Sequence, residues 1–161
     1  MDVCFKTENG VFNYRVCGII LHDDKILALH DERSPYFYLP GGRVNLHEKS
    51  SAAILRELKE ELLIDAKIIR ALWVDENFFI EDVNRKKYHE ICIYYLIDVS
   101  QTDLLNRGEE FVIHEGNKTL TFKWLDIYTL DKQYLNPPFI KKEILNLPDT
   151  LTLRVEELEA K

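Results

Sequence analysis

Alternation of apolar and polar positions predicts β-structure near the start of the chain. Residues 15–21 and 25–29 are rich in β-branched and large apolar side chains, and the His-Asp-Asp cluster at 22–24 favours a tight turn between them. This order predicts a hairpin. A third short strand is predicted at 36–39, and it ends at Pro40, which two glycines follow. Proline fixes one backbone dihedral and glycine permits shapes closed to other residues, so a loop is expected there.

A helix is predicted over residues 52–62, where nearly every residue is a good helix former. Ser50 and Ser51 precede this segment, and either side chain is suited to cap the first turn. The apolar residues fall on one stripe at a spacing of about 3.6 residues, which predicts that the helix packs against a sheet. They are Ile54, Leu55, Leu58 and Leu62.

The second half of the chain continues with strands and turns. The pattern predicts strands at 67–74 and 90–97 around a polar turn at 84–87, a polar connection at 101–117, a strand at 121–124, a turn at 127–130, a helix at 139–147 and a strand or loose end from 151. The first two strands are predicted to form a hairpin, and two prolines before the last helix suit a first helical turn. No repeat or linker divides the chain, so one domain over residues 1–161 is expected.

Charge and composition exclude several kinds of function. The chain has 21 basic and 28 acidic residues, a formal net charge of −7, which repels extended DNA or RNA. A small phosphorylated metabolite stays compatible, because divalent cations can locally reverse the sign of an acidic pocket. The three cysteines lie far apart in apolar stretches and indicate buried reduced thiols, and no segment has the length of a membrane span. We therefore expect a cytoplasmic protein without membrane contact.

One face of the predicted helix carries acidic residues. Glu57, Glu60 and Glu61 lie at i, i+3 and i+4, so their carboxylates project from about one third of the helix circumference. Like charges this close repel unless cations hold them together, and oxygen ligands select magnesium, manganese or calcium over zinc. Gly41, just upstream, lets a backbone carbonyl turn toward the same place and add an uncharged ligand. A divalent-cation site is therefore predicted.

The spacing around this helix is more specific than its three glutamates. An Arg-Glu-x-x-Glu-Glu segment by itself is most often a solvated face with ion pairs, for instance Arg56 with Glu60. Here Gly42 is followed after five residues by Glu48 and after seven more by Arg56. This arrangement resembles the Nudix box, Gly-x5-Glu-x7-Arg-Glu-apolar-x-Glu-Glu-x-Gly-apolar, of the Nudix hydrolases. Leu63 stands where the family usually has the glycine that ends the helix, so we expect the helix to continue or to close differently.

The resemblance implies an α/β fold, an α/β/α sandwich with a mixed central sheet. It also implies hydrolysis of a phosphoanhydride bond with Mg²⁺ or Mn²⁺ as cofactor. By position, Glu57, Glu60 and Glu61 would hold the cation, and a carboxylate would accept the proton of the attacking water. Arg56 would orient a glutamate by a charge-assisted bond, and Glu48 would brace the loop or act through water.

Other site residues are less tightly constrained. Family members often use a further acidic residue, as metal ligand or general base, and Glu115 is the first candidate here, with Glu90 and Glu110 as alternatives. The basic residues Arg43 and Arg33 are candidates for binding substrate phosphates, although exposed basic side chains need no function. The aromatic pair at 78–79 suits a core position more often than a nucleobase stack, and Phe79 is the candidate for stacking.

Three hypotheses of function follow. The leading one is a pyrophosphohydrolase that releases a nucleoside monophosphate from a small nucleotide. A MutT-like nucleoside triphosphate pyrophosphatase is favoured, because residues 64–97 contain no proline and so lack the patterns associated with ADP-ribose and NADH enzymes. The alternatives are a non-catalytic Nudix-fold sensor of a nucleotide or nucleotide sugar, and a structural interaction domain without metal affinity. Members of the family frequently dimerise, so a homodimer is one expectation for the assembly.

Overall fold

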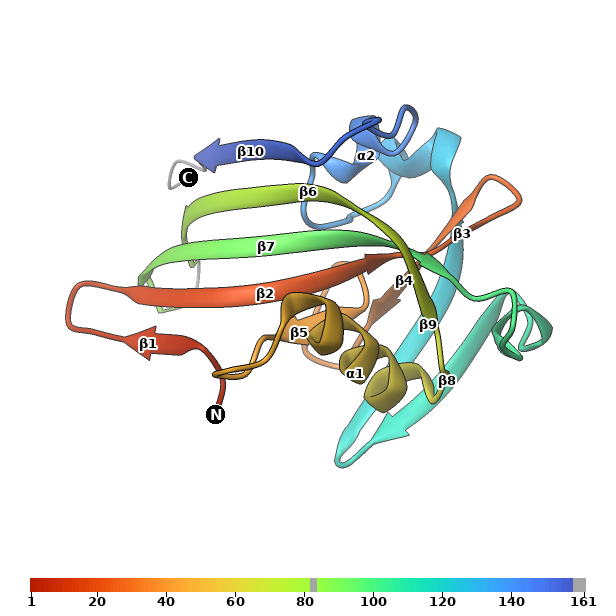
Figure 1. The fold of residues 1–161 in the computed structure, drawn as a ribbon, viewed down its shortest axis with the longest axis horizontal. Coiled ribbons are helices and arrows are strands. Elements are labelled where there is room, and N and C mark those ends of the chain that lie inside the picture. Colours follow the sequence, from red (N-terminus) through yellow and green to blue (C-terminus); the bar gives the residue numbers. More distant parts are fainter. Residues whose placement is uncertain (82–83, 158–161) are drawn as a thin grey trace.

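Two β-sheets and one main helix make up the fold (Figure 1), and the computed structural model describes residues 1–81 and 84–157. Within this range the larger sheet runs in the order β1 (Cys4–Lys6), β2 (Val11–Ile19), β7 (Lys87–Asp98), β6 (Lys67–Ile80) and β10 (Thr152–Glu157), and β5 (Gly41–Arg43) also pairs with β2. The smaller sheet runs in the order β3 (Leu21–His22), β4 (Lys25–His30), β9 (Lys118–Asp126) and β8 (Glu110–Glu115).

The larger sheet contains both parallel and antiparallel strand pairs. β6 and β7 form the predicted antiparallel hairpin, whereas β2 lies parallel to β7 and β10 lies parallel to β6. Helix α1 (Ser50–Leu62) packs against one face of this sheet, and the short helix α2 (Ile140–Glu143) packs against the other. The predicted α/β class with a mixed sheet is therefore confirmed.

The predicted hairpin between 15–21 and 25–29 is only partly correct. β2 pairs with β7 on one side and with β5 on the other, so it has no free edge for β4. The chain leaves the larger sheet at Ile20, and only the two residues of β3 pair with β4. Asp23 and Asp24 form the turn with φ values of 48° and 61°, which are typical of a tight hairpin turn.

Helix α1 begins earlier than predicted and has no side-chain cap. Its N-cap residue is Lys49, which makes no capping hydrogen bond, so the expectation of a serine cap is wrong. The Ser50 hydroxyl instead lies 2.6 Å from the hydroxyl of Tyr95 on β7. Burial of the apolar stripe holds the helix against the sheet, and each such side chain contributes about 2 kcal/mol. The fully buried members of the stripe are Ile54, Leu58 and Leu62.

Leu63 closes α1 in a backbone conformation that favours glycine. Its φ and ψ are 57° and 38°, in the left-handed region, and its N–H donates to the Lys59 carbonyl at 3.0 Å. The helix therefore ends at the box position and does not continue. The Leu63 side chain is 64% exposed, so burial offsets little of the left-handed penalty, about 1–2 kcal/mol for an L-residue.

Replacing Leu63 with glycine is expected to raise the free energy of unfolding by about 1 kcal/mol, because the relief of backbone strain exceeds the added entropy of the unfolded chain. Urea denaturation of Leu63→Gly and Leu63→Ala measures this, since alanine keeps the left-handed penalty and serves as the matched control. Equal midpoints for the glycine and alanine variants would show that the cap is not strained.

The segments on either side of Pro40 differ from the prediction. Residues 36–39 form isolated bridges, from Phe37 to Leu135 and from Tyr38 to Leu29, and not a strand. The glycines expected in a loop belong to β5, which pairs with β2. The loop begins only after Arg43, and β5 consequently places its outer edge beside α1.

The second half contains one strand that the sequence pattern did not predict. The polar connection at 101–117 includes β8, which forms a hairpin with β9. Apolar and polar residues alternate over only a few positions of β8, and charged and polar residues surround them. The composition of this segment is therefore typical of a loop. Helix α2 ends at Glu143, although the prediction extended it to 147.

Buried apolar side chains form two clusters, one around α1 and one around α2. Cys17 and Cys92 are buried as expected, and their sulfur atoms lie 3.6 Å apart, whereas Cys4 is partly exposed. Over residues 1–81 and 84–157, none of the helices is long and apolar enough to cross a bilayer.

Candidate active site

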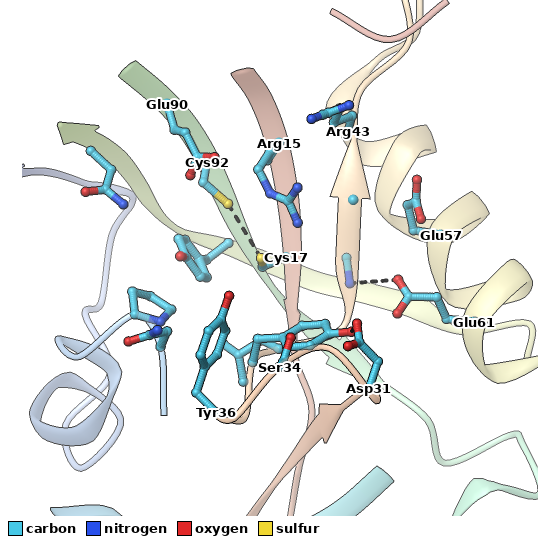
Figure 2. A pocket seen from close by; sticks show the side chains of 18 of the residues that line it. Arg15, Cys17, Asp31, Ser34, Tyr36, Arg43, Glu57, Glu61, Glu90 and Cys92 are labelled. Atoms are coloured by element: carbon cyan, nitrogen blue, oxygen red, sulfur yellow. Dashed lines mark hydrogen bonds between the residues drawn. The ribbon is translucent and has the colours of Figure 1, made fainter. Parts of the chain in front are cut away.

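A cavity of about 730 Å³ lies over the larger sheet, with residues of β2, β5, β6 and β7 among its lining. The segments at 31–39 and 136–138 and the β8–β9 hairpin also contribute lining residues. Figure 2 shows Glu57 and Glu61 from α1 on the β5 side of this space, with Arg15, Cys17 and Cys92 on its floor. A cavity of this size suits a small molecule with a few polar anchor points.

Arg56 connects the residues of the predicted acid cluster. Its guanidinium donates to both carboxylate oxygens of Glu48, at 2.7 and 2.8 Å, and to Glu57 at 2.9 Å. It also donates to the Arg43 carbonyl at 3.0 Å and makes longer contacts of 3.4 Å with Glu60. These contacts fit the predicted orienting role of Arg56, because a planar guanidinium holds several acceptors in fixed directions.

Glu48 has both carboxylate oxygens engaged. One accepts from the Asn45 backbone N–H at 3.0 Å, and both accept from Arg56. The Arg56 hydrogen bond, aided by that of Asn45, lowers the pKa of Glu48 to about 2. These contacts favour the bracing role of Glu48 over action through water, because its oxygens are already occupied.

Glu57 and Glu61 are carboxylates withdrawn from water. Burial raises the pKa of Glu57, although Arg56 opposes this, and burial raises the pKa of Glu61 well above its usual range. Glu61 accepts a hydrogen bond from the Gly41 N–H at 3.0 Å, and Glu60 is about half exposed. In residues 1–81 and 84–157, no three acidic, histidine or cysteine side chains converge on a metal position as they stand.

The donor set nevertheless fits a hard divalent cation. All the predicted side-chain ligands are carboxylates, and burial raises the pKa of two of them, the buried Glu61 and the half-buried Glu57, a cost that a bound cation would relieve. Residues on an antiparallel strand alternate in directing N–H and C=O toward the partner and away from it. The Gly41 N–H donates to Glu61, so by this alternation the Gly41 carbonyl is expected on the same side, facing away from β2. Mg²⁺ and Mn²⁺ match these oxygen donors.

Two of the predicted substrate-binding residues lie at the cavity and one does not. Arg43 lines the cavity, and its guanidinium lies 3.6 Å from the Asp2 carboxylate. Phe79, the candidate for stacking, also lines the cavity, where it is half-buried and stacked on Tyr88. Arg33 is exposed and does not line the cavity, because its loop turns there and its backbone N–H donates to Asp31.

The candidates for the further acidic residue are also separated by the structure. Glu115 and Glu90 line the cavity, whereas Glu110 does not. Glu115 is close enough to raise the pKa of Glu61. Glu90 accepts a hydrogen bond from Asn13 at 3.0 Å. The geometry keeps Glu115 first, because it lies near the glutamates of α1 and no hydrogen bond within the described residues engages its carboxylate.

Arg15 is a cavity residue that the sequence prediction missed. It projects from β2 beside Cys17 and Cys92 (Figure 2), and its positive charge opposes the rise in the pKa of Glu57. A basic residue at an inward position of an otherwise apolar strand was the available signal. Arg15 and Arg43 are register neighbours on β2 and β5, so two cations flank the acid cluster.

A family model described as the NUDIX domain matches residues 12–144, which cover most of the chain and the whole acid cluster. The chain belongs to the Nudix family. The prediction of a Nudix hydrolase is thereby confirmed, and the residues grouped around Arg56 are those of the Nudix box.

One curated relative of this Nudix protein is an ADP-ribose pyrophosphatase from Methanocaldococcus jannaschii, which is 34% identical over 87 residues. The match covers 52% of this chain and 49% of the relative, so the chain matches about half the length of that protein. Activity on ADP-ribose is named for that relative and is a property of that protein.

Solved structures show the same fold. The mutator MutT protein of Bacillus halodurans superposes with a TM-score of 0.58 at 16% identity, covering 87% of this chain and 88% of the other. An ADP-ribose pyrophosphatase from Streptococcus suis superposes with a TM-score of 0.55 at 17% identity, covering 89% and 98%. Identities this low support the fold alone.

Proposed function

We propose that this Nudix protein is a divalent-metal-dependent pyrophosphohydrolase that cleaves a phosphoanhydride bond in a small nucleotide. The observation that carries the proposal is the excess of negative charge beside β5. Among the described residues, Arg56 is the only cation in an ion pair with the box glutamates, which are Glu48, Glu57, Glu60 and Glu61. A divalent cation would balance this charge and would bind phosphate oxygens at the same time.

Each residue of the site has a separate role in this proposal. Glu57, Glu60, Glu61 and the Gly41 carbonyl would hold Mg²⁺ or Mn²⁺, which when bound would neutralise diphosphate oxygens and lower the pKa of bound water. Arg56 fixes the direction of the Glu57 carboxylate, and Glu48 fixes Arg56.

Residues around the box would bind the substrate and accept the proton. Arg15 and Arg43 would bind phosphate oxygens, since both line the cavity beside the acid cluster. Glu115 is the proposed carboxylate that takes the proton from the attacking water, with Glu90 as the alternative. Phe79 lies at the side of the cavity formed by β6, where a nucleobase could stack on it.

Two substrate types remain candidates. The absence of proline in residues 64–97 favours a nucleoside triphosphate, which would give a nucleoside monophosphate and pyrophosphate. The relative from Methanocaldococcus jannaschii favours ADP-ribose. A panel of nucleoside triphosphates, ADP-ribose and nucleotide sugars, with products identified by mass, separates these cases because it fixes both the bond cleaved and the base preferred.

Removal of the metal is expected to abolish turnover of every substrate in this panel. EDTA should reduce turnover to background, and added Mg²⁺ or Mn²⁺ should restore it. Burial favours the protonated forms of Glu57 and Glu61 and a cation favours the ionised forms, so metal binding should release protons and tighten as pH rises. Calorimetric titration with Mn²⁺ in two buffers of different ionisation enthalpy measures this release. Turnover that persists in EDTA would contradict the proposal, and tight nucleotide binding without turnover would identify a sensor.

A further inference from the structure

The wall of the cavity formed by β6, the side remote from α1, carries hydrogen-bond acceptors without donors. Asp75 and Asn77 occupy alternate positions of this strand and both line the cavity. The Oδ1 atom of each is buried and accepts no hydrogen bond within the described residues. Asp75 is only 1% exposed. Its register neighbour Arg154 on β10 directs its guanidinium toward Glu143 and Glu156 instead.

An unpartnered carboxylate in this position is unfavourable for the fold alone. Burial, together with the charges of Glu156 and Glu90, raises the pKa of Asp75 to about 7, and the charge of Arg154 opposes this rise. A buried acceptor without a donor is uncommon in folded proteins and concentrates where a ligand supplies the missing donor. A hydrogen-bond donor entering the cavity would relieve this cost.

Strand register places Asp75 at a fixed distance from the phosphate-binding side. One row across the sheet contains Asp75 on β6, Cys92 on β7, Arg15 on β2 and Arg43 on β5. Three strand spacings separate its two ends, roughly 14 Å. Cations and the acid cluster lie at one end and acceptors lie at the other, so a bound nucleotide would extend along this row, with its phosphates at the β5 end.

We propose that Asp75 is a specificity-determining residue that accepts a hydrogen bond from the nucleoside part of the substrate and so selects substrates with a donor at that point. The assignment rests on the proposed function, because the scissile phosphates must lie at the β5 end. Asn77 supplies a second acceptor on the same wall. The donor is a base amino group or a sugar hydroxyl, since each satisfies a carboxylate oxygen.

Paired substrates test the proposal. GTP and ITP differ by one amino group, ATP and purine-riboside triphosphate differ by another, and GTP and dGTP differ by one sugar hydroxyl. The wild-type protein should show at least a tenfold higher KM, with similar kcat, for the member of one pair that lacks the donor. Asp75→Leu should reduce this ratio to within about threefold. If Asp75→Leu loses discrimination between two nucleotides that differ in the base, the donor belongs to the base. If it loses discrimination between GTP and dGTP, the donor belongs to the ribose.

Controls separate recognition from folding. Glu76→Leu makes the same change at the neighbouring position of β6, which does not line the cavity, and should keep the wild-type ratios. Asp75→Leu should denature at a higher temperature than wild type at pH 8, because it removes a buried ionised carboxyl. Asp75→Asn repeats the measurement if the leucine variant does not fold, and it should weaken discrimination with KM affected more than kcat.

The outcomes also distinguish this proposal from the proposed function. If Asp75→Leu and Asp75→Asn keep every wild-type ratio, the proposal is overturned and water alone satisfies the Asp75 oxygen. If the wild-type protein hydrolyses no member of the panel, the proposed function fails. Calorimetric Kd values for the same pairs of nucleotides then decide whether Asp75 accepts a hydrogen bond from the bound nucleotide. Equal Kd values within every pair would overturn the assignment.

Discussion

Glu60→Gln is expected to lower the metal-dependent kcat by about 10²- to 10⁴-fold while leaving the melting temperature near that of the wild type. The Glu60 side chain is 48% exposed, and within the described part of the chain its polar contacts are those of 3.4 Å with Arg56. Its removal therefore deprives the proposed cation site of one charged ligand at little cost to packing. Steady-state kinetics with Mg²⁺ and thermal denaturation of the same preparation measure both quantities.

Glu109→Gln is the matched control for this prediction. Glu109 is exposed and pairs with Lys25 at 3.2 Å on the smaller sheet, so its amide variant should keep the wild-type kcat. The affinity for Mn²⁺ should fall in the Glu60 variant and not in the Glu109 variant. Full turnover by the Glu60 variant would remove this residue from the proposed ligand set. It would support the alternative in which the acidic face of the helix is solvated and binds no cation.

Gly42→Ala is expected to lower kcat about 100-fold with a much smaller loss of stability. A methyl group on Gly42 would overlap the carboxylate of Glu57, which would have to turn away from β5. Glu57 would then lose its 2.9 Å contact with Arg56, and a misplacement of about 1 Å at a reacting centre costs about 100-fold in rate. The backbone at Gly42 has no positive φ, so alanine adds little strain there.

Two further variants make this second prediction decisive. Gly108→Ala places alanine at a positive φ of 89° at a residue that does not line the cavity, so it should lower stability and keep kcat. In the Gly42→Ala background, Glu57→Asp shortens the displaced side chain and should recover part of the lost stability. Kinetics and urea denaturation of the three variants separate displacement of a ligand from general loss of a glycine. Equal kcat values for Gly42→Ala and wild type would show that Glu57 does not need its present position.

Local spacing made the acid cluster predictable. Helical periodicity alone places Glu57, Glu60 and Glu61 on one face, and the helix is found there. The β6–β7 hairpin was predictable for the same reason, since both strands alternate strongly and a polar turn joins them. The end of the helix was not predictable in this way. Leucine at position 63 suggested that the helix would continue or close differently, but a backbone hydrogen bond ends the helix there without a glycine.

Contacts between distant segments were not predictable in this way. β2 does not pair with β4 as predicted, because β7 and β5 occupy its two edges. Both of these strands come later in the chain than the predicted turn at 22–24. β8 was missed because its pairing with β9, and not its composition, makes it a strand. The serine cap failed because Ser50 contacts Tyr95, which is 45 residues away.

The sequence by itself determined the family motif, the helix that carries it and the cluster of carboxylates that favours a cation, because these depend on spacings within one continuous segment, from Gly42 to Leu63. The tertiary structure alone decided which residues from other strands face the cavity. Irregularities in the β6–β7 register, between Ile68 and Arg70 and between Ala71 and Trp73, shift the side-chain alternation along β6. Asp75 and Arg15 therefore line the same cavity because pairing across the sheet fixes the strand register. A local sequence pattern does not specify that register.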